Sequence, residues 1–150
     1  FQTPTYVAFT YTNAEFQENI GTSSGGSIFA GAVSGNKVPY ISPYVISAGT
    51  GVIYKKLNVN IDANYTSESW ADGRNLSTNN ATDGDASERF GKIDEQWTID
   101  AAVGYQVNKK VRLFSNFKNI TNESFIVSRQ PAGPRPNLPF SMMAGLEFDL

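Results

Sequence analysis

Arginine is the residue type whose placement first suggests chemistry in this sequence. Four of the five arginines lie in long segments rich in glycine, serine, asparagine and proline: Arg74, Arg89, Arg129 and Arg135. The planar guanidinium group binds carboxylates and other anions through paired hydrogen bonds. We therefore predict that these four side chains are candidate contacts for an anionic small ligand. Pairing with nearby acids, or with phosphates of a surrounding membrane, is the alternative interpretation.

A second group of candidate residues is a set of carboxylates in one of these segments: Asp72, Asp83, Asp85 and Glu88. Clustered carboxylates can bind calcium. Their spacing does not match the calcium loop of an EF-hand, and Asp-Gly pairs are common turn formers. We therefore interpret the set as part of a solvated loop and predict no metal site.

Two missing residue types narrow the function further. The sequence has no histidine and no cysteine. It therefore lacks the side chains for Ser–His hydrolysis, thiolate catalysis, iron–sulfur ligation and most zinc sites. The net charge is −2, which disfavours nucleic acid as a partner. We expect neither an enzyme nor a resident cofactor.

The elements that must position these residues are β-strands. In residues 57–66, LNVNIDANYT, apolar or aromatic residues alternate with polar ones without a break. Strict alternation indicates a strand with one apolar face, because successive side chains point to opposite sides. The same pattern, with some irregularity, predicts six strands in all: residues 5–12, 44–54, 57–66, 97–107, 111–118 and 140–150.

The connections between these strands alternate in length. Lys55-Lys56 and residues 108–110 form short turns, whereas residues 13–43, 67–96 and 119–139 form long loops. No run of about 20 apolar residues could form a membrane helix. Outer-membrane barrels combine tilted strands with short periplasmic turns and long extracellular loops. The pattern therefore favours an all-β fold, an antiparallel transmembrane β-barrel segment with its long loops outside.

Each predicted strand then has a lipid face and a lumen face. Aromatic residues mark both ends of the lipid face, at Tyr44, Trp97 and Phe140 outside and at Tyr54, Tyr105 and Phe148 inside. The predicted lumen face carries Asn58, Asn60, Asp62, Asn64, Asp100, Arg112, Asn116 and Lys118. A soluble antiparallel sandwich, with the apolar faces turned inward, is the competing interpretation.

Several stretches of the chain resemble one known family. They read YVAFTYTNAEF at 6–16, NKVPYISPYVISAG at 36–49, WTIDAAVGYQV at 97–107, VRLFSNFKNITNESF at 111–125 and PAGPRP at 131–136. In this order, and with an alternating strand at the end, they resemble TonB-dependent outer-membrane receptors, most closely the ferric-citrate and siderophore receptors. The family's motif after the penultimate strand corresponds here to Asn119-Ile120-Thr121-Asn122 with Phe125.

The resemblance implies a barrel of about 22 strands with an N-terminal plug inside. Residues 1–150 would be the C-terminal part of that barrel, with the plug absent from this chain. Partners would be a ferric chelate, the TonB complex acting through the missing plug, and the lipid and lipopolysaccharide of the bacterial outer membrane. The start at Phe1 is expected of a processed product, a fragment or a trimmed chain. The end at Leu150 departs from the aromatic residue on which outer-membrane barrels commonly finish, and is compatible with a natural end or with the loss of a terminal residue.

Two further alternatives remain open at this stage. Residues 27–33 and 124–129 could supply two more strands and complete a small eight-stranded barrel with a structural or adhesive role. The chain could also be a soluble β domain that binds carbohydrate. A soluble domain requires a dry apolar core, whereas a barrel segment requires partner strands at residues 5–12 and 140–150.

Overall fold

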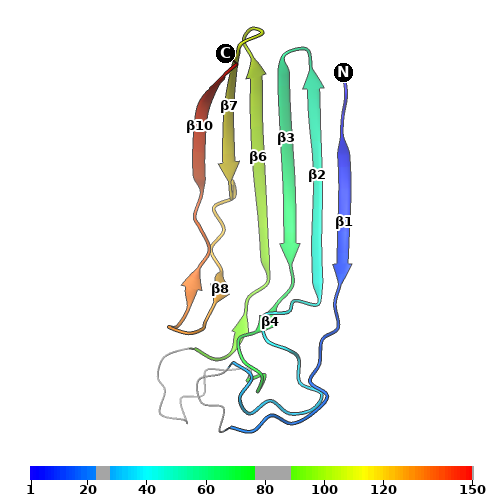
Figure 1. Ribbon diagram of the computed structural model, residues 1–150, viewed down its shortest axis with the longest axis vertical. Helices are drawn as coiled ribbons and strands as arrows, with labels where there is room; N and C mark the ends of the chain where they lie inside the picture. Colours follow the sequence, from blue (N-terminus) through cyan, green and yellow to red (C-terminus); the bar gives the residue numbers. More distant parts are fainter. Residues whose placement is uncertain (23–27, 77–88, 150) are drawn as a thin grey trace.

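The computed structural model describes residues 1–22, 28–76 and 89–149, and within them it is all β. Six long strands form one antiparallel sheet in the order β1-β2-β3-β6-β7-β10 (Figure 1). Their bounds are β1 Thr5–Tyr11, β2 Tyr44–Tyr54, β3 Leu57–Thr66, β6 Gln96–Gln106, β7 Val111–Lys118 and β10 Ser141–Phe148. Two short pairs lie outside this sheet, β4 Ser69–Trp70 with β5 Lys92–Ile93, and β8 Ile126–Ser128 with β9 Arg135–Pro136.

The six strands expected from alternation are confirmed, three with the expected bounds and three with ends that differ by one or two residues. Of the two extra strands of the small-barrel alternative, the one expected at residues 124–129 is present as the short β8. The one expected at residues 27–33 is not found in its described part, residues 28–33. Neither extends the six-stranded sheet. Residues 28–33 form turns and an irregular stretch, and β8 pairs with β9 rather than joining the six-stranded sheet. The sheet therefore keeps two open edges, at β1 and at β10, which lie on opposite sides in Figure 1.

Strand register separates the side chains into an apolar and a polar face. Val59 lies opposite Val103, and Ile61 lies opposite Ala101, on the apolar face. On the other face Asp62 lies opposite Asp100. Because the side-chain period of a strand is two, this register places all residues of the predicted lumen face on the same side of the sheet.

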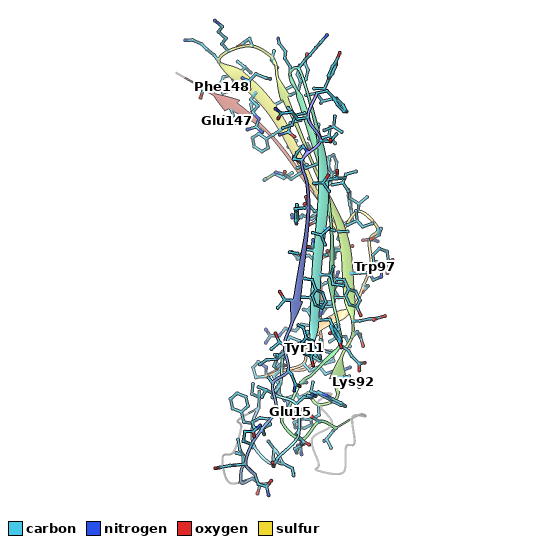
Figure 2. The ribbon with its side chains drawn as sticks, turned by 90° about the vertical axis from the view of Figure 1, so that its right-hand side faces the viewer. Tyr11, Glu15, Lys92, Trp97, Glu147 and Phe148 are labelled. Atoms are coloured by element: carbon cyan, nitrogen blue, oxygen red, sulfur yellow. The ribbon has the colours of Figure 1, made fainter. Side chains whose placement is uncertain are left out.

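The sheet is one curved layer without a core of its own (Figure 2). Within the described residues, the buried apolar side chains are Ala32, Ala71 and Ile93, and none of them belongs to the six-stranded sheet. Its apolar face is open instead, with Phe9 62 %, Ile61 48 % and Leu146 56 % exposed. A soluble sandwich would bury this face against a second sheet. The structure therefore argues against that alternative.

Polar side chains on the apolar face satisfy their hydrogen bonds locally. Ser115 interrupts the apolar alternation of β7, and its hydroxyl donates to the carbonyl oxygen of Met143 at 3.1 Å. Thr5 and Thr50 lie opposite each other and share a hydrogen bond of 3.0 Å between their hydroxyls. Such pairing removes the cost of placing a hydroxyl against hydrocarbon, so these residues are compatible with a lipid-facing surface.

The three long loops pack together at one end of the sheet, and we call their described residues the loop cap. The first two loops are joined by Gly73 N–H to the Ile28 carbonyl at 2.7 Å and by Tyr40 N–H to the Trp70 carbonyl at 2.9 Å. The third loop is joined by the guanidinium of Arg129, which donates to the Lys92 carbonyl at 2.7 Å. The described part of the chain has no helix with the length and apolarity of a membrane crossing.

Candidate ligand-binding site

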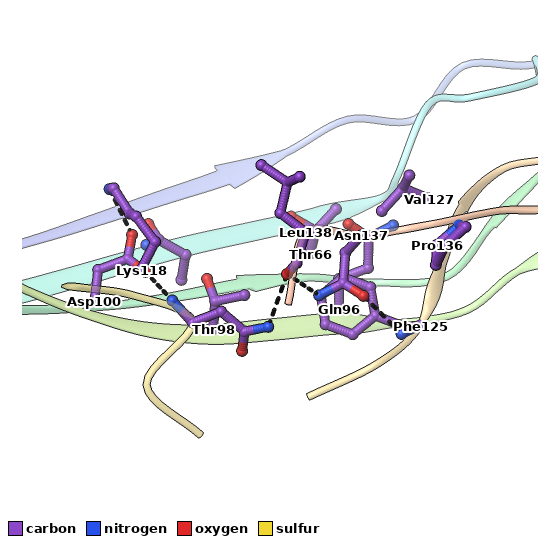
Figure 3. A pocket seen from close by; sticks show the side chains of 12 residues that line it. Thr66, Gln96, Thr98, Asp100, Lys118, Phe125, Val127, Pro136, Asn137 and Leu138 are labelled. Atoms are coloured by element: carbon purple, nitrogen blue, oxygen red, sulfur yellow. Dashed lines mark hydrogen bonds and ion pairs between the residues drawn. The ribbon is translucent and has the colours of Figure 1, made fainter. Parts of the chain in front are cut away.

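A hollow of about 540 Å³ lies where the polar face of the sheet meets the loop cap (Figure 3). Its floor is formed by the loop-side ends of β3, β6 and β7, and its other side by β8, β9 and the residues next to them. The lining residues are Asn64, Thr66, Gln96, Thr98, Asp100, Lys118, Asn119, Phe125, Val127, Pro136, Asn137 and Leu138. Its volume is within the range of small-molecule sites, about 300–1,000 Å³.

The floor of the hollow holds one ion pair. Lys118 Nζ lies 2.7 Å from Asp100 Oδ2, and the second oxygen of Asp100 accepts the Asn119 backbone N–H at 2.9 Å. The Asp100 side chain is 17 % exposed and that of Lys118 is 65 % exposed. The site combines hydrogen-bonding groups with apolar contacts on its other side.

Asn119 shapes the exit from β7 toward the hollow. Its backbone has a φ of 49°, in the left-handed region that asparagine tolerates better than most residues. Its side-chain amide donates to the carbonyls of Glu123 at 2.9 Å and Leu138 at 3.0 Å, and its amide oxygen accepts the Glu123 N–H at 3.0 Å. Asn119 is only 4 % exposed. It therefore ties the two ends of the third loop together.

The arginines predicted from sequence are partly brought together. Arg74 stacks on the ring of Phe90, with its guanidinium carbon 4.1 Å from the ring centre, and Arg89 approaches the same ring at 5.9 Å. The Nε of Arg74 also lies 3.3 Å from Asp72 Oδ1. Arg74 and Arg89 thus lie near the same aromatic ring and have contacts within the chain.

The other two predicted arginines lie on the third loop. Arg129 donates to the Lys92 carbonyl, as described above, and is half-buried. Arg135 lies on β9 and is exposed. Within the described residues, Arg135 has no ion pair. None of the four arginines lines the hollow. Their contact with a ligand stays a prediction. The side chains that line the hollow are neutral amides and hydroxyls, apolar groups and the Asp100–Lys118 ion pair.

The carboxylates considered for calcium fall largely outside the described residues, which include only Asp72 of the four. Asp72 is 2 % exposed, and one of its oxygens accepts the Arg74 backbone N–H at 2.9 Å. In the described part of the chain no group of three or more histidine, cysteine or acidic residues could hold a metal ion.

Elsewhere in the loop cap, the Lys37 ammonium lies 2.6 Å from Glu15 and lowers the pKa of that carboxyl group.

The polar face pairs its own side chains across neighbouring strands. Asp62 accepts a hydrogen bond of 2.8 Å from the Tyr6 hydroxyl. The tyrosine reaches it by lying over Gly49, where an added Cβ would overlap both the Tyr6 ring and the Asp62 carboxylate. Sequence reasoning missed Tyr6 as a polar-face residue with a partner. The available signal was Gly49 in an otherwise alternating strand, since a glycine within a strand indicates that another group approaches the backbone closely at that position.

Several other polar-face residues also pair with one another. The Ser47 hydroxyl donates to Asn64 at 2.9 Å, the Asn60 amide donates to Asn58 at 3.1 Å, and Arg112 lies 3.4 Å from Glu147. Contact of this face with a plug stays a prediction. Phe114 also lies on this face, and its ring covers Gly145 at 2.5 Å from the position a Cβ would take. This cover explains why an aromatic residue interrupts the polar alternation of β7.

A comparison with protein families shows to which class of protein this sheet belongs. Residues 1–120 match the family model of the TonB-dependent receptor-like β-barrel. The chain belongs to the TonB-dependent receptor β-barrel family. No curated protein sequence matches it. As in the rest of this family, the protein is located in the bacterial outer membrane, so the apolar face of the sheet is its lipid face and the polar face its lumen face.

Three solved transporter and receptor structures share the fold. The ferric citrate transporter FecA, in its unliganded form, matches with a TM-score of 0.77 and 21 % identity over 97 % of this chain. The siderophore receptor PiuA from Acinetobacter baumannii matches with a TM-score of 0.74 and 19 % identity over 97 % of this chain. The ferripyoverdine receptor of Pseudomonas aeruginosa, bound to ferripyoverdine, matches with a TM-score of 0.61 and 20 % identity over 77 % of this chain. The chain spans 21 %, 19 % and 15 % of these three proteins.

Proposed function

We propose that this chain forms the C-terminal section of the barrel wall of a receptor that imports a ferric chelate, such as a siderophore complex or ferric citrate. The hollow between the lumen face and the loop cap carries the proposal, because it lies on the wall at the end that faces the outside of the cell. The structural neighbours support it, since they are a ferric citrate transporter, a siderophore receptor and a ferripyoverdine receptor.

The open edges of the sheet support the view that the wall continues. Within the described residues, β1 pairs only with β2 and β10 pairs only with β7. In hydrocarbon, unpaired backbone groups cost several kcal/mol each, so a stable barrel must pair both edges. We propose that strands outside this chain complete a barrel of about 22 strands. A plug inside it would contact the lumen face and be energised by TonB.

The transport proposal is tested by uptake of iron-55 through the full-length receptor. Cells that lack the gene are complemented with the native receptor and offered ferric citrate, a ferric catecholate and a ferric hydroxamate, with and without functional TonB. We expect the receptor to restore uptake of at least one chelate, and only with TonB. Restoration of none of the three classes refutes the ferric-chelate proposal.

The role of the hollow is tested by filling its rim. Leu138 lines the hollow and is 79 % exposed, so Leu138→Trp adds volume there without disturbing a packed core. We expect weaker binding of the transported chelate. Leu57→Trp is the matched control, because Leu57 lies at the turn end of the lipid face, where an aromatic residue suits the membrane interface. Equal binding in both variants contradicts a ligand site in the hollow.

A further inference from the structure

The two short turns carry four lysines that differ from all other lysines of the chain. Lys37, Lys92 and Lys118 each form an ion pair with a carboxylate. The turn lysines are Lys55, Lys56, Lys109 and Lys110, and all four are exposed. No carboxylate of the described residues forms an ion pair with any of them. Among the described residues, this end of the wall therefore carries four lysine charges without an ion-pair partner.

Two of these lysines have defined positions. Lys55 Nζ lies 5.2 Å from the ring centre of Tyr54, which belongs to the lipid face. Its charge is therefore placed toward the lipid side of the wall. Lys56 Nζ donates to the Val107 carbonyl at 2.6 Å, and the Gln106 N–H donates to the Lys56 carbonyl at 2.8 Å. These bonds hold the two turns side by side, so their charges act on one surface.

An aromatic belt sets the depth of this surface in the membrane. Tyr54, Tyr105 and Phe148 lie at the same end of the lipid face and are 49 %, 44 % and 63 % exposed. Aromatic rings of this kind lie at the level of the lipid headgroups. Lys55 and Lys56 directly follow β2, which ends at Tyr54, and Lys109 and Lys110 lie in the turn between β6, which carries Tyr105, and β7. They are therefore at the headgroup level or just beyond it, on the periplasmic side where short turns lie.

We infer that the turn lysines bind the phosphate groups of anionic phospholipids in the periplasmic leaflet. Charge complementarity selects this occupant, because exposed ammonium groups beside an aromatic belt meet headgroup phosphates in that plane. The inference goes beyond ferric-chelate transport and does not depend on it. Each lysine near an anionic surface strengthens association by about fivefold. The effect is electrostatic, so it weakens as the salt concentration rises.

The test compares lipids that stay bound to the full-length receptor. The receptor is held in detergent micelles with equal amounts of phosphatidylglycerol and phosphatidylcholine, and bound lipids are counted by native mass spectrometry. We expect enrichment of phosphatidylglycerol on the native receptor and a fall of several-fold in Lys109→Gln/Lys110→Gln. The matched control Lys37→Gln/Lys92→Gln removes two charges from the loop cap and should keep the enrichment. An equal fall in both variants, or a fall in neither, overturns the inference.

A second measurement needs no variant. The native receptor is placed in nanodiscs of pure phosphatidylglycerol or pure phosphatidylcholine, and lysine acetylation is followed by peptide mass spectrometry. We expect slower labelling of Lys55, Lys109 and Lys110 in phosphatidylglycerol, and no difference at Lys37. Equal labelling of the turn lysines in the two lipids refutes headgroup binding and leaves a periplasmic macromolecule as the partner of these charges.

Discussion

Replacing Asn119 is the most direct test of how the loop cap is attached to the barrel wall. Asn119→Ala removes the three side-chain hydrogen bonds to Glu123 and Leu138, which are 2.9–3.0 Å long. It also places alanine at a φ of 49°, where a Cβ without a polar side chain is unfavourable. At about 1 kcal/mol for each hydrogen bond and about 1 kcal/mol for the backbone, the expected loss is about 3–5 kcal/mol.

A matched set of variants separates the contribution of the side-chain hydrogen bonds from that of the backbone conformation. Asn119→Gly loses the same hydrogen bonds but relieves the backbone strain, so it should be about 1 kcal/mol more stable than Asn119→Ala. Asn116→Ala is the control, because Asn116 lies three residues earlier on the lumen face in ordinary strand conformation. A surface change of this kind should cost less than about 0.5 kcal/mol.

The assay is unfolding of the full-length receptor by guanidinium chloride in phospholipid vesicles, followed by circular dichroism and by mobility on unheated gels. The free energy of unfolding is compared among the native receptor and the three variants. If Asn119→Ala and Asn116→Ala lose equal stability, the hydrogen-bond argument is refuted. If the alanine and glycine variants at position 119 are equal, the backbone argument is refuted.

Two other consequences follow from the faces and the charges. Ile61→Lys places an ammonium group in the middle of the lipid face and should lower the free energy of unfolding in vesicles by about 2–4 kcal/mol, whereas Asn60→Lys, on the lumen face, should cost far less. The Glu15–Lys37 pair should respond to acid, because the pKa of Glu15 is lowered by Lys37. Its stabilising effect is present above pH 4.5, the ordinary value for the carboxyl group, and is lost as the pH falls through the lowered value. A carboxyl titration of Glu15 by NMR checks this, and an ordinary or raised pKa contradicts the ion pair.

Local sequence pattern was sufficient for the sheet. In β3 the alternation from Leu57 to Thr66 predicts both the strand and its two faces, because the side-chain period of two needs no information from distant residues. The interruptions at Phe114 and Ser115 could not be interpreted in this way. Phe114 covers Gly145 and Ser115 bonds to the Met143 carbonyl, and both contacts depend on how β7 pairs with β10.

The candidate site was predicted less well, for a physical reason. Arginine in a loop indicates a possible anion contact, but the side chain can equally pair within the protein, as Arg74 does with Asp72 and Phe90. The hollow itself is lined by residues from β3, β6, β7, β8 and β9. No local pattern joins Thr66, Asp100 and Leu138, because only the register of the strands and the return of the third loop bring them together.

By itself, the sequence determined the six strands, their lipid and lumen faces, and the alternation of short turns with long loops, because these depend on neighbouring residues and on composition. The tertiary structure alone decided that the loops pack into one cap, that Tyr6 reaches Asp62 across Gly49, and that Lys55 lies beside Tyr54 while Lys56 donates to the Val107 carbonyl of the neighbouring turn. These features depend on hydrogen bonds and charges between residues that are far apart in the chain. Their partners become defined only when the strands are in register.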